Sequence, residues 1–535
     1  MAYAILFLYI SVQDYRAVLP MKTTAATVLA DVPAHQRERV LSGMRWSVWL
    51  SSLAVPCGAA INLLLARVSP ETIGVYGLLN VYIGLIVAFL YFGGDTVVIK
   101  LIPECTVDKR ASFLASYLAV LFALLAGWLV FAYLCPAAIE LVLGHETGHR
   151  LNFILLCLAP VPILFYAVVA ALKGMLEIRL SQMLAKLLTI ISMAAYGVIF
   201  LFARPLLAHH PTGVIWSIYL ALTGTLALIG ASRVFRLCGQ PQLRFHLPRG
   251  FWRYAVDTQL VGVVFFFSSR LDYILVLNFG GLAVLGRYVA IMAVAATVPM
   301  MNSLFMDTLL PAVTNMIASH NPRGAGQVFM IHMRILFLIT VAAGCAVMLL
   351  AAPAAVVMGP KYRSVEGLIV LMTMFQCIAS PGAYGGTLLS SIGRQRLAVW
   401  TGLLGAAMFS ALFLATWHRW NLTGAVTAYG LALLFSNCLL MTIALKTAPI
   451  FPSIAGLWFK AALVQTAVGS IAMWWMPLGP VASLVTWVTG LAVFLWAAHY
   501  DLRELKLLAR MFIPGPTVLL GDATAAAPKF IIGEK

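Results

Sequence analysis

The feature that most constrains this chain is a series of apolar runs, each long enough to cross a lipid bilayer. A bilayer core of about 30 Å is crossed by a helix of about 20 apolar residues. Fourteen such runs follow one another, at about 46–66, 77–99, 113–135, 151–171, 182–203, 213–231, 255–278, 284–306, 334–355, 366–389, 397–417, 424–445, 454–475 and 480–499. The predicted fold class is therefore an all-α polytopic membrane protein with about fourteen transmembrane helices, and a soluble globular fold is excluded.

Charge and cysteine content narrow the class further. The net charge of +17 would suggest a nucleic-acid partner in a soluble protein, but only 10% of the residues are charged. The basic residues lie mainly in short links between apolar runs, which indicates membrane topology and not nucleic-acid binding. The eight cysteines include no C-x-x-C pair, and most lie inside apolar runs. We therefore expect neither a disulfide framework nor a metal or cofactor.

The distribution of basic residues predicts the orientation of the spans. With the N-terminus inside, links predicted to be inside carry 25 of the 35 Lys and Arg residues, and links predicted to be outside carry 7. This excess on one side follows the positive-inside rule and predicts that both termini are cytoplasmic. Every outside link is short, which leaves no room for an external catalytic domain. We therefore expect that the protein is not an enzyme.

An internal repeat divides the chain into two similar halves. At a constant offset of 212 residues, Gly74 and Tyr76 match Gly286 and Tyr288, and the pair Asp95–Thr96 matches Asp307–Thr308. Six spans separate the copies, so both copies have the same orientation, as in transporters built from parallel repeats. The repeat predicts two pseudo-symmetric six-helix lobes. The predicted division is 1–44 cytoplasmic lead, 45–231 N-lobe, 232–254 basic linker, 255–446 C-lobe, 447–500 last two spans and 501–535 cytoplasmic tail.

Several motifs resemble those of one transporter family. The stretch Leu63–Glu104 contains ARVSPETIGVYG and ends in FGGDTVVIKLIPE, and Ser268–Val294 contains DYILVLNFGGLAVLGRY. Met358–Met372 (MGPKYRSVEGLIVLM) and Leu388–Trp400 (LLSSIGRQRLAVW) follow in the same order. Their order and spacing resemble the Wzx-type branch of the multidrug/oligosaccharidyl-lipid/polysaccharide flippase superfamily. The basic lead before Arg45 departs from the pattern of many members.

This resemblance implies a function. A protein of this family would carry an undecaprenyl-diphosphate-linked oligosaccharide across the cytoplasmic (inner) membrane of a bacterium, for O-antigen, capsule or exopolysaccharide assembly. Its partners would be this lipid-linked substrate and the bilayer, together with polysaccharide polymerases and glycosyltransferases. Two other functions stay open: a multidrug-type exporter of small molecules, and a membrane enzyme of polysaccharide assembly.

Charged residues inside apolar runs are the best candidates for contact with cargo, because a charge at membrane depth is costly unless it faces a cavity or a partner. Arg270 and Asp272 lie within the seventh run. Arg270 is predicted to bind the diphosphate, and Asp272 is predicted to balance the positive charge or to couple transport to an ion. The alternative is a local ion pair between the two residues that braces the contact between the lobes. The other predicted substrate-binding residues are Arg67, Arg287, Lys186, Asn62 and Gln259, where an interfacial anchor is the alternative for the basic ones. Asp95 and Asp307 are predicted to gate the lobes.

One motif suggests different chemistry. His145 to His149 read HETGH, which matches the H-E-x-x-H signature of zinc proteases. That chemistry needs both histidines on one face of a helix. Here Gly148 disfavours a helix, and the motif lies in a short link that is predicted to be outside. An incidental polar turn is therefore the favoured interpretation, and no metal site is predicted.

Overall fold

The computed structural model describes residues 50, 53–143, 148–175, 177–238, 245–300, 322–392, 394–448, 453–474 and 479–499. Within these ranges the secondary structure is helical, with no strand. After an apolar helix at Leu53–Val68, the first half of the chain forms α4 (Pro70–Leu85), the π-helix η1 (Ile86–Leu90), α5 (Gly94–Glu104), α6 (Val107–Leu134), α7 (Pro136–Leu143), α8 (Gly148–Cys157), α9 (Pro160–Gly174), α10 (Ile178–Phe202), α11 (Arg204–His209) and α12 (Pro211–Cys238). The second half forms α13 (Phe251–Ala295), α15 (Pro322–Leu349), α16 (Ala351–Met358), the 3-10 helix η3 (Pro360–Val365), α17 (Glu366–Ser391), α18 (Gln395–Thr447), α19 (Ala455–Trp474) and α20 (Pro480–Ala497).

Described helical residues lie in each of the fourteen predicted runs, and parts of the first run (46–66) and of the eighth run (284–306) lie outside the described residues. Ten of the described helices are long and apolar enough to cross a membrane, and Leu53–Val68 and Val481–Ala497 are shorter apolar helices. Two of the ten, α13 and α18, each contain two spans, because a single residue breaks each helix. These residues are Gly281 (φ 75°) and Asn421 (φ 44°). The chain is thus a multi-pass α-helical membrane protein, as the apolar runs predict.

The second span begins earlier than its apolar run suggests. The predicted apolar run begins at about residue 77, whereas α4 begins at Pro70. Ser69 caps this helix by accepting a hydrogen bond from the backbone N–H of Thr72 (3.1 Å), and proline is favoured at the first helical position. Because Ser69 alone separates α4 from the preceding helix, the link between the first two spans is as short as those at Gly281 and Asn421.

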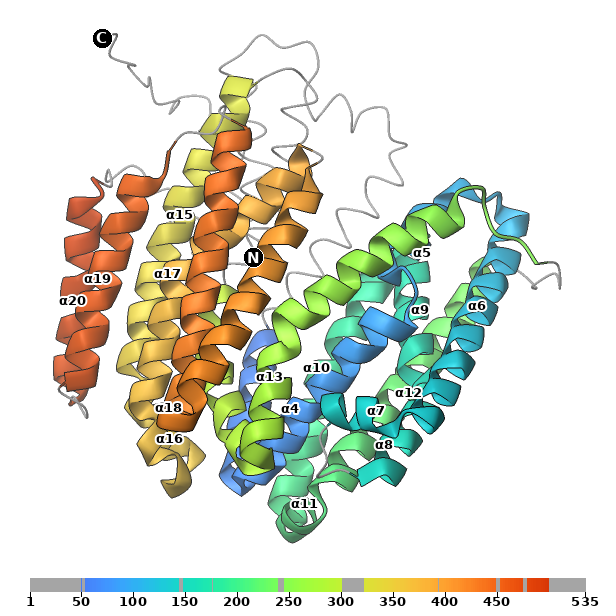
Figure 1. Cartoon of the computed structure of the whole chain (residues 1–535), viewed down its shortest axis with the longest axis horizontal. Coiled ribbons are helices and arrows are strands. Elements are labelled where there is room, and N and C mark those ends of the chain that lie inside the picture. Colours follow the sequence, from blue (N-terminus) through green and yellow to red (C-terminus); the bar gives the residue numbers. More distant parts are fainter. Residues whose placement is uncertain are drawn as a thin grey trace, which may run out of the picture.

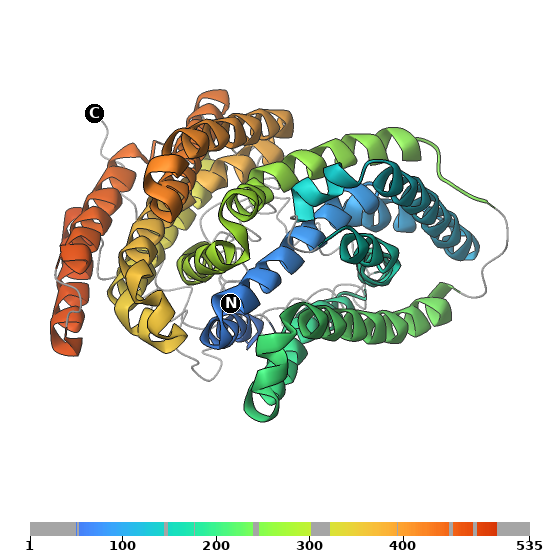
Figure 2. The ribbon, with the colours of Figure 1, turned by 60° about the horizontal axis from the view of Figure 1, so that its bottom comes forward.

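The helices form two groups, with α13 between them. Figure 1 shows α15 to α20 on one side and α4 to α12 on the other, and Figure 2 shows the same division from another direction. The helices α11 and α16, which belong to links predicted to be outside, lie at the lower end in Figure 1, and α5 lies toward the upper end. We call these two ends the outer and the inner face.

The lobes cross closely near the outer face. A Cβ on Gly286 would overlap the carbonyl oxygen of Pro70 and lie 2.6 Å from its carbonyl carbon, and a Cβ on Gly74 would overlap the carbonyl oxygen of Leu282. The two contacts are related by the repeat, because Pro70 and Leu282 differ in number by the same 212 as the two glycines. Glycine therefore permits the crossing of α4 and α13 at two positions that correspond to each other in the two halves.

The last two helices pack on the side of the second group that faces away from α13 (Figure 1). The indole N–H of Trp458 in α19 donates to the carbonyl of Ile378 in α17 (2.7 Å). The indole N–H of Trp487 in α20 donates to the carbonyl of Ala342 in α15 (2.8 Å). These bonds fasten α19 and α20 to the helices of the C-lobe.

Candidate functional site

The seam between α4 and α13 brings the strongest candidates together. The first arm of α13, before Gly281, runs antiparallel to α4 and to the segment after it. Along this seam, glycines on one side face larger residues on the other: Gly77 faces Tyr273, Gly84 faces Phe266 and Arg270, and Gly93 faces Ala255. Without side chains, these glycines allow the two backbones to approach. Arg270 and Asp272 therefore lie on the helix of the predicted C-lobe that contacts the N-lobe most intimately.

Arg270 lies on this seam, and no carboxylate among the described residues forms an ion pair with it. Its Cγ is 3.4 Å from the position of a Cβ on Gly84, and its guanidinium carbon is 5.6 Å from the centre of the Tyr273 ring. The side chain is half-buried, and within the described residues it makes no ion pair. A cation at membrane depth without an ion-pair partner is costly, and the cost falls when an anion binds. Contact between Arg270 and cargo stays a prediction that this geometry permits.

Asp272 is held by a tyrosine and not by Arg270. The carboxylate is only 2% exposed, and the Tyr288 hydroxyl donates to its Oδ2 (2.8 Å). Within the described part of the chain, the other oxygen, Oδ1, has no hydrogen-bond partner. The residues Arg270 and Asp272 are two positions apart on one helix and point in different directions, which agrees with the absence of a pair between them. Tyr288 is a functional candidate that the sequence reasoning missed, although it belongs to the repeated Gly-x-Tyr motif.

We predict that Asp272→Asn leaves the amount of folded protein close to that of the wild type but lowers transport by about tenfold, because the asparagine amide can neither carry the negative charge nor take up a proton. The amide has the shape of the carboxyl group and can still accept the bond from Tyr288, so the packing survives whereas the titratable group is lost. Fluorescence-detected gel filtration measures the folded protein, and complementation of a transport-deficient host measures activity. Thr258→Val on the same helix is the control. Full activity of Asp272→Asn would contradict a coupling role for the carboxylate.

The remaining predicted basic residues have different surroundings. Arg287 is half-buried on α13 just after the Gly281 break, and its Nε is buried without a partner. Lys186 is half-buried in α10. One turn later in this helix, the methyl group of Thr189 lies 3.7 Å from the position of a Cβ on Gly58, so this part of α10 packs against the first helix. Arg67 is exposed at the end of that first helix. Three of the four basic candidates are thus half-buried, namely Arg270, Arg287 and Lys186, whereas Arg67 is exposed. Contact of these residues with cargo stays a prediction.

The two polar candidates bond to backbone. Asn62 donates to the carbonyl of Gly58 (2.9 Å) within its own helix. The amide of Gln259 accepts a hydrogen bond from the N–H of Gly93 (2.8 Å) and donates one to the carbonyl of Ala88. Both ends of the Gln259 side chain are thus engaged with the opposite helix of the seam.

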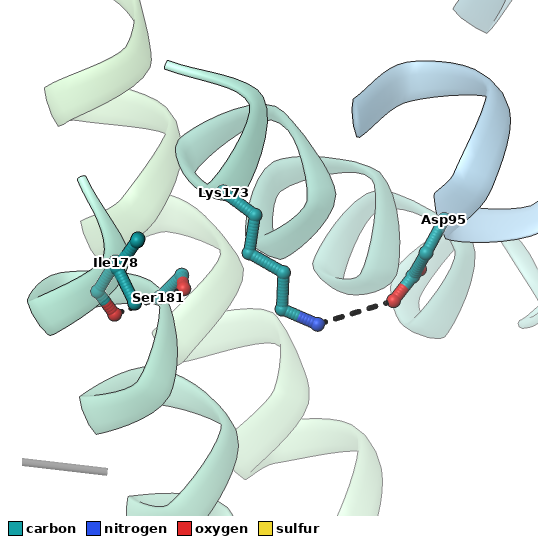
Figure 3. Close-up of polar contacts among 4 residues, drawn as sticks. All are labelled: Asp95, Lys173, Ile178 and Ser181. Atoms are coloured by element: carbon teal, nitrogen blue, oxygen red, sulfur yellow. Dashed lines mark hydrogen bonds and ion pairs between the residues drawn. The ribbon is translucent and has the colours of Figure 1, made fainter. Parts of the chain in front are cut away.

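Asp95 forms an ion pair within the N-lobe. Its Oδ2 lies 3.4 Å from Nζ of Lys173, which comes from the last turn of α9 (Figure 3). Lys100, which the sequence places close to Asp95, instead lies 4.0 Å above the ring of Tyr254. Asp307 lies outside the described residues. Gating by the two aspartates stays a prediction, and for Asp95 the partner in this conformation belongs to the same lobe.

No group of three metal-ligating side chains is present among the residues that the structure describes. His145, Glu146 and Thr147 lie outside those residues, and nothing is described of the side chain of His149. The H-E-x-x-H motif is therefore untested by the structure.

Comparisons with known proteins identify the fold. No protein-family model matches the chain, and no curated protein sequence matches it significantly. Among solved structures, the lipid II flippase MurJ in an inward closed conformation matches with a TM-score of 0.65 at 13% identity, over 86% of this chain and 99% of that one. A multidrug-resistance MATE-family transporter of the MOP superfamily, inward-facing, matches with a TM-score of 0.60 at 13% identity, over 74% and 94%. The chain has the fold of MOP-superfamily transporters.

A third MOP-superfamily transporter, from Pyrococcus furiosus, matches with a TM-score of 0.55 at 14% identity, over 77% of this chain and 96% of that one. These MOP-superfamily structures are of transporters and flippases. At 13–14% identity, these matches show the fold of the chain alone.

Proposed function

We propose that this protein is a flippase for a lipid-linked oligosaccharide, with an undecaprenyl-diphosphate carrier as the anionic part of the cargo. It would act by alternating access in the cytoplasmic membrane of a bacterium, beside the glycosyltransferases and polymerase of a surface polysaccharide. The observation that carries the proposal is the half-buried Arg270, which makes no ion pair with a carboxylate among the residues that the structure describes. A guanidinium group binds phosphate oxygens through two parallel hydrogen bonds, so a diphosphate would supply the missing partner.

The similarity to MurJ supports a lipid cargo. That structure is described as a lipid II flippase, and the match extends over 86% of this chain. The sequence motifs that resemble the polysaccharide branch support an oligosaccharide on the lipid. Asp272 does not neutralise Arg270 in this arrangement, because its one bonded oxygen is directed to Tyr288. The positive charge of Arg270 therefore remains available to an anion.

A multidrug exporter is the second candidate, favoured by the match to the inward-facing MATE transporter. The two candidates differ in the charge that they require of the cargo. An unpaired arginine attracts an anionic headgroup and repels an organic cation at the same position. Replacing Arg270 with glutamine should therefore weaken transport of a diphosphate lipid, whereas it should leave unchanged or improve transport of a cationic drug.

We expect that deletion of the gene in a polysaccharide-producing host abolishes the surface polymer and causes lipid-linked repeat units to accumulate on the inner leaflet. The polymer is measured by gel electrophoresis of surface glycans, and the leaflet by access of a membrane-impermeant lectin to intact cells and to inside-out vesicles. Re-expression of the wild-type chain is the matched control. Normal polymer together with altered tolerance to cationic drugs would contradict the flippase and favour the exporter.

A further inference from the structure

The second span is broken toward its inner end. The π-helix η1 ends at Leu90, and α5 begins at Gly94. Gly93, which directly precedes α5, and Gly94, the first residue of α5, have left-handed backbone conformations, with φ of 76° and 60°. A Cβ on Gly93 would also lie 3.1 Å from Cα of Ala255, so glycine is needed there for both conformation and space. The break leaves backbone groups without the partners that a continuous helix would supply.

Gln259 of α13 supplies two of these partners. Its side-chain oxygen accepts from the N–H of Gly93 (2.8 Å), and its side-chain nitrogen donates to the carbonyl of Ala88. The carbonyl of Ala88 lies before the break and the N–H of Gly93 lies within it, and one amide bonds to both. Loss of the amide would leave a donor and an acceptor unpaired in an apolar region, which is unfavourable. The interaction therefore joins the first arm of α13 to the N-lobe at a defined point.

The chain before Gln259 is also anchored in the N-lobe. Phe251 is only 1% exposed and packs edge-on against the rings of Phe113 and Tyr117 in α6 (6.5 and 6.2 Å between centroids). The backbone N–H of His246 donates to Oγ of Ser116 (2.8 Å). The inner part of α13 and the described residues just before it, from His246 onward, are thus fixed to α6 and to the break in the second span.

The chain after Ser268 has different partners. A Cβ on Gly402 of α18 would lie 3.0 Å from Oγ of Ser268. Nearer the outer face, the ring of Phe279 packs edge-on against Phe413 of α18 (5.5 Å between centroids). Between the two regions, a Cβ on Gly262 would meet nothing within 4 Å. The first arm of α13 therefore divides into an inner part attached to the N-lobe and an outer part that also packs on the C-lobe.

We propose that Gln259 is a positioning residue for transport: it fastens residues 251–259 to the break in the second span, so that this inner part of α13 moves with the N-lobe. The moving boundary between the lobes then lies inside α13, between Gln259 and Ser268, and not in the linker 232–254. This inference requires that the lobes move relative to each other, and it is independent of the cargo.

The first test removes the amide and keeps its volume. Gln259→Leu should lower transport by about tenfold or more, because two buried backbone groups lose their partner, while the amount of folded protein changes little. Thr258→Val is the matched control, because Thr258 bonds only to the carbonyl of Tyr254 in its own helix. Gln259→Glu should recover at acidic pH, where a protonated carboxyl can both accept and donate. Wild-type transport in Gln259→Leu, or a Gln259→Glu defect that is unchanged at acidic pH, would overturn the proposal.

The second test measures the moving boundary without reference to any cargo. In the purified chain in nanodiscs, spin labels are placed on exposed positions: Arg253 of α13, Lys109 of α6 and Arg396 of α18. Double electron–electron resonance should give a single narrow distance distribution between labels at positions 253 and 109. This distribution should be the same in sodium and in potassium, and the same at acidic and at alkaline pH. The pair 253 and 396 should give a broad or shifting distribution. The reverse result would place residues 251–259 with the C-lobe and overturn the inference.

The distance measurement uses no cargo, so its result would be the same if the chain transported a drug instead of a lipid. Failure of the proposed function can therefore be distinguished from failure of this inference. Gln259→Leu adds a further discrimination in the same measurement. It should broaden the narrow distance between 253 and 109, whereas Thr258→Val should leave it unchanged. A narrow distance in both variants would show that Gln259 does not fasten the two segments.

Discussion

Arg270→Ala should reduce transport of a lipid-linked oligosaccharide by about a hundredfold or more, since two charge-assisted hydrogen bonds to a diphosphate are worth roughly 3–6 kcal/mol. The folded protein should remain at its normal level, because within the described residues Arg270 makes no ion pair that its removal would disrupt. Arg270→Lys keeps the charge but not the planar donor fork, and we expect an intermediate loss. Surface polymer in a complemented deletion strain measures the effect.

Arg253→Ala serves as the control for this substitution, because Arg253 lies on the same helix but is exposed near the inner face. It should retain full activity. If Arg270→Ala also complemented fully, the cation would have no contact with cargo, and the proposal that rests on it would fail.

Gly286→Ala should lower the thermal stability of the protein by an amount corresponding to about 2–3 kcal/mol, the upper range for overpacking. The added methyl group would overlap the carbonyl of Pro70, which is backbone and cannot rotate away. Relief requires α4 and α13 to separate near the outer face. We therefore also expect a population in which this face is open, measured as faster labelling of a cysteine introduced there with a membrane-impermeant maleimide.

The reciprocal contact gives this prediction two internal checks. Gly74→Ala should produce a similar loss, because its Cβ would overlap the carbonyl of Leu282 in the same way. Gly262→Ala, on the same helix as Gly286, should be neutral, because nothing lies within 4 Å of the added atom. Equal stability of all three variants would show that the crossing is looser than its geometry indicates.

The spans were predictable because the hydropathy of each segment of about 20 residues can be read directly from its own sequence. The fourteen apolar runs recur as helices, and the offset of 212 residues recurs in the reciprocal contacts of Gly74 and Gly286. The position of Ser69 as a cap could also have been anticipated, because Ser followed by Pro is a common helix start. The apolar runs could not predict how short the outer links at Gly281 and Asn421 are. At each of these positions a single residue with non-helical backbone angles connects two helices.

The site was less predictable because side-chain partners come from distant segments. Arg270 and Asp272 were identified by the cost of charge in a membrane, but that argument does not reveal that Tyr288 and not Arg270 bonds to Asp272. Asp95 pairs with Lys173, 78 residues away, and not with Lys100, which is near it in the sequence. Gln259 is predicted to bind substrate, and the structure shows that both of its amide atoms bond to backbone at a helix break that hydropathy does not detect.

The attachment of α19 and α20 makes the two moving parts unequal in cross-section. Because Trp458 and Trp487 bond to carbonyls of α17 and α15, a tilt of those two helices would also displace the exposed apolar side chains of α19 and α20, such as Phe459 and Trp496. Mismatch between a hydrophobic surface and the local bilayer thickness costs fractions of a kcal/mol per Å. The equilibrium between the two orientations should therefore depend on acyl-chain length, which makes the surrounding lipid an effector of the rate as well as a solvent.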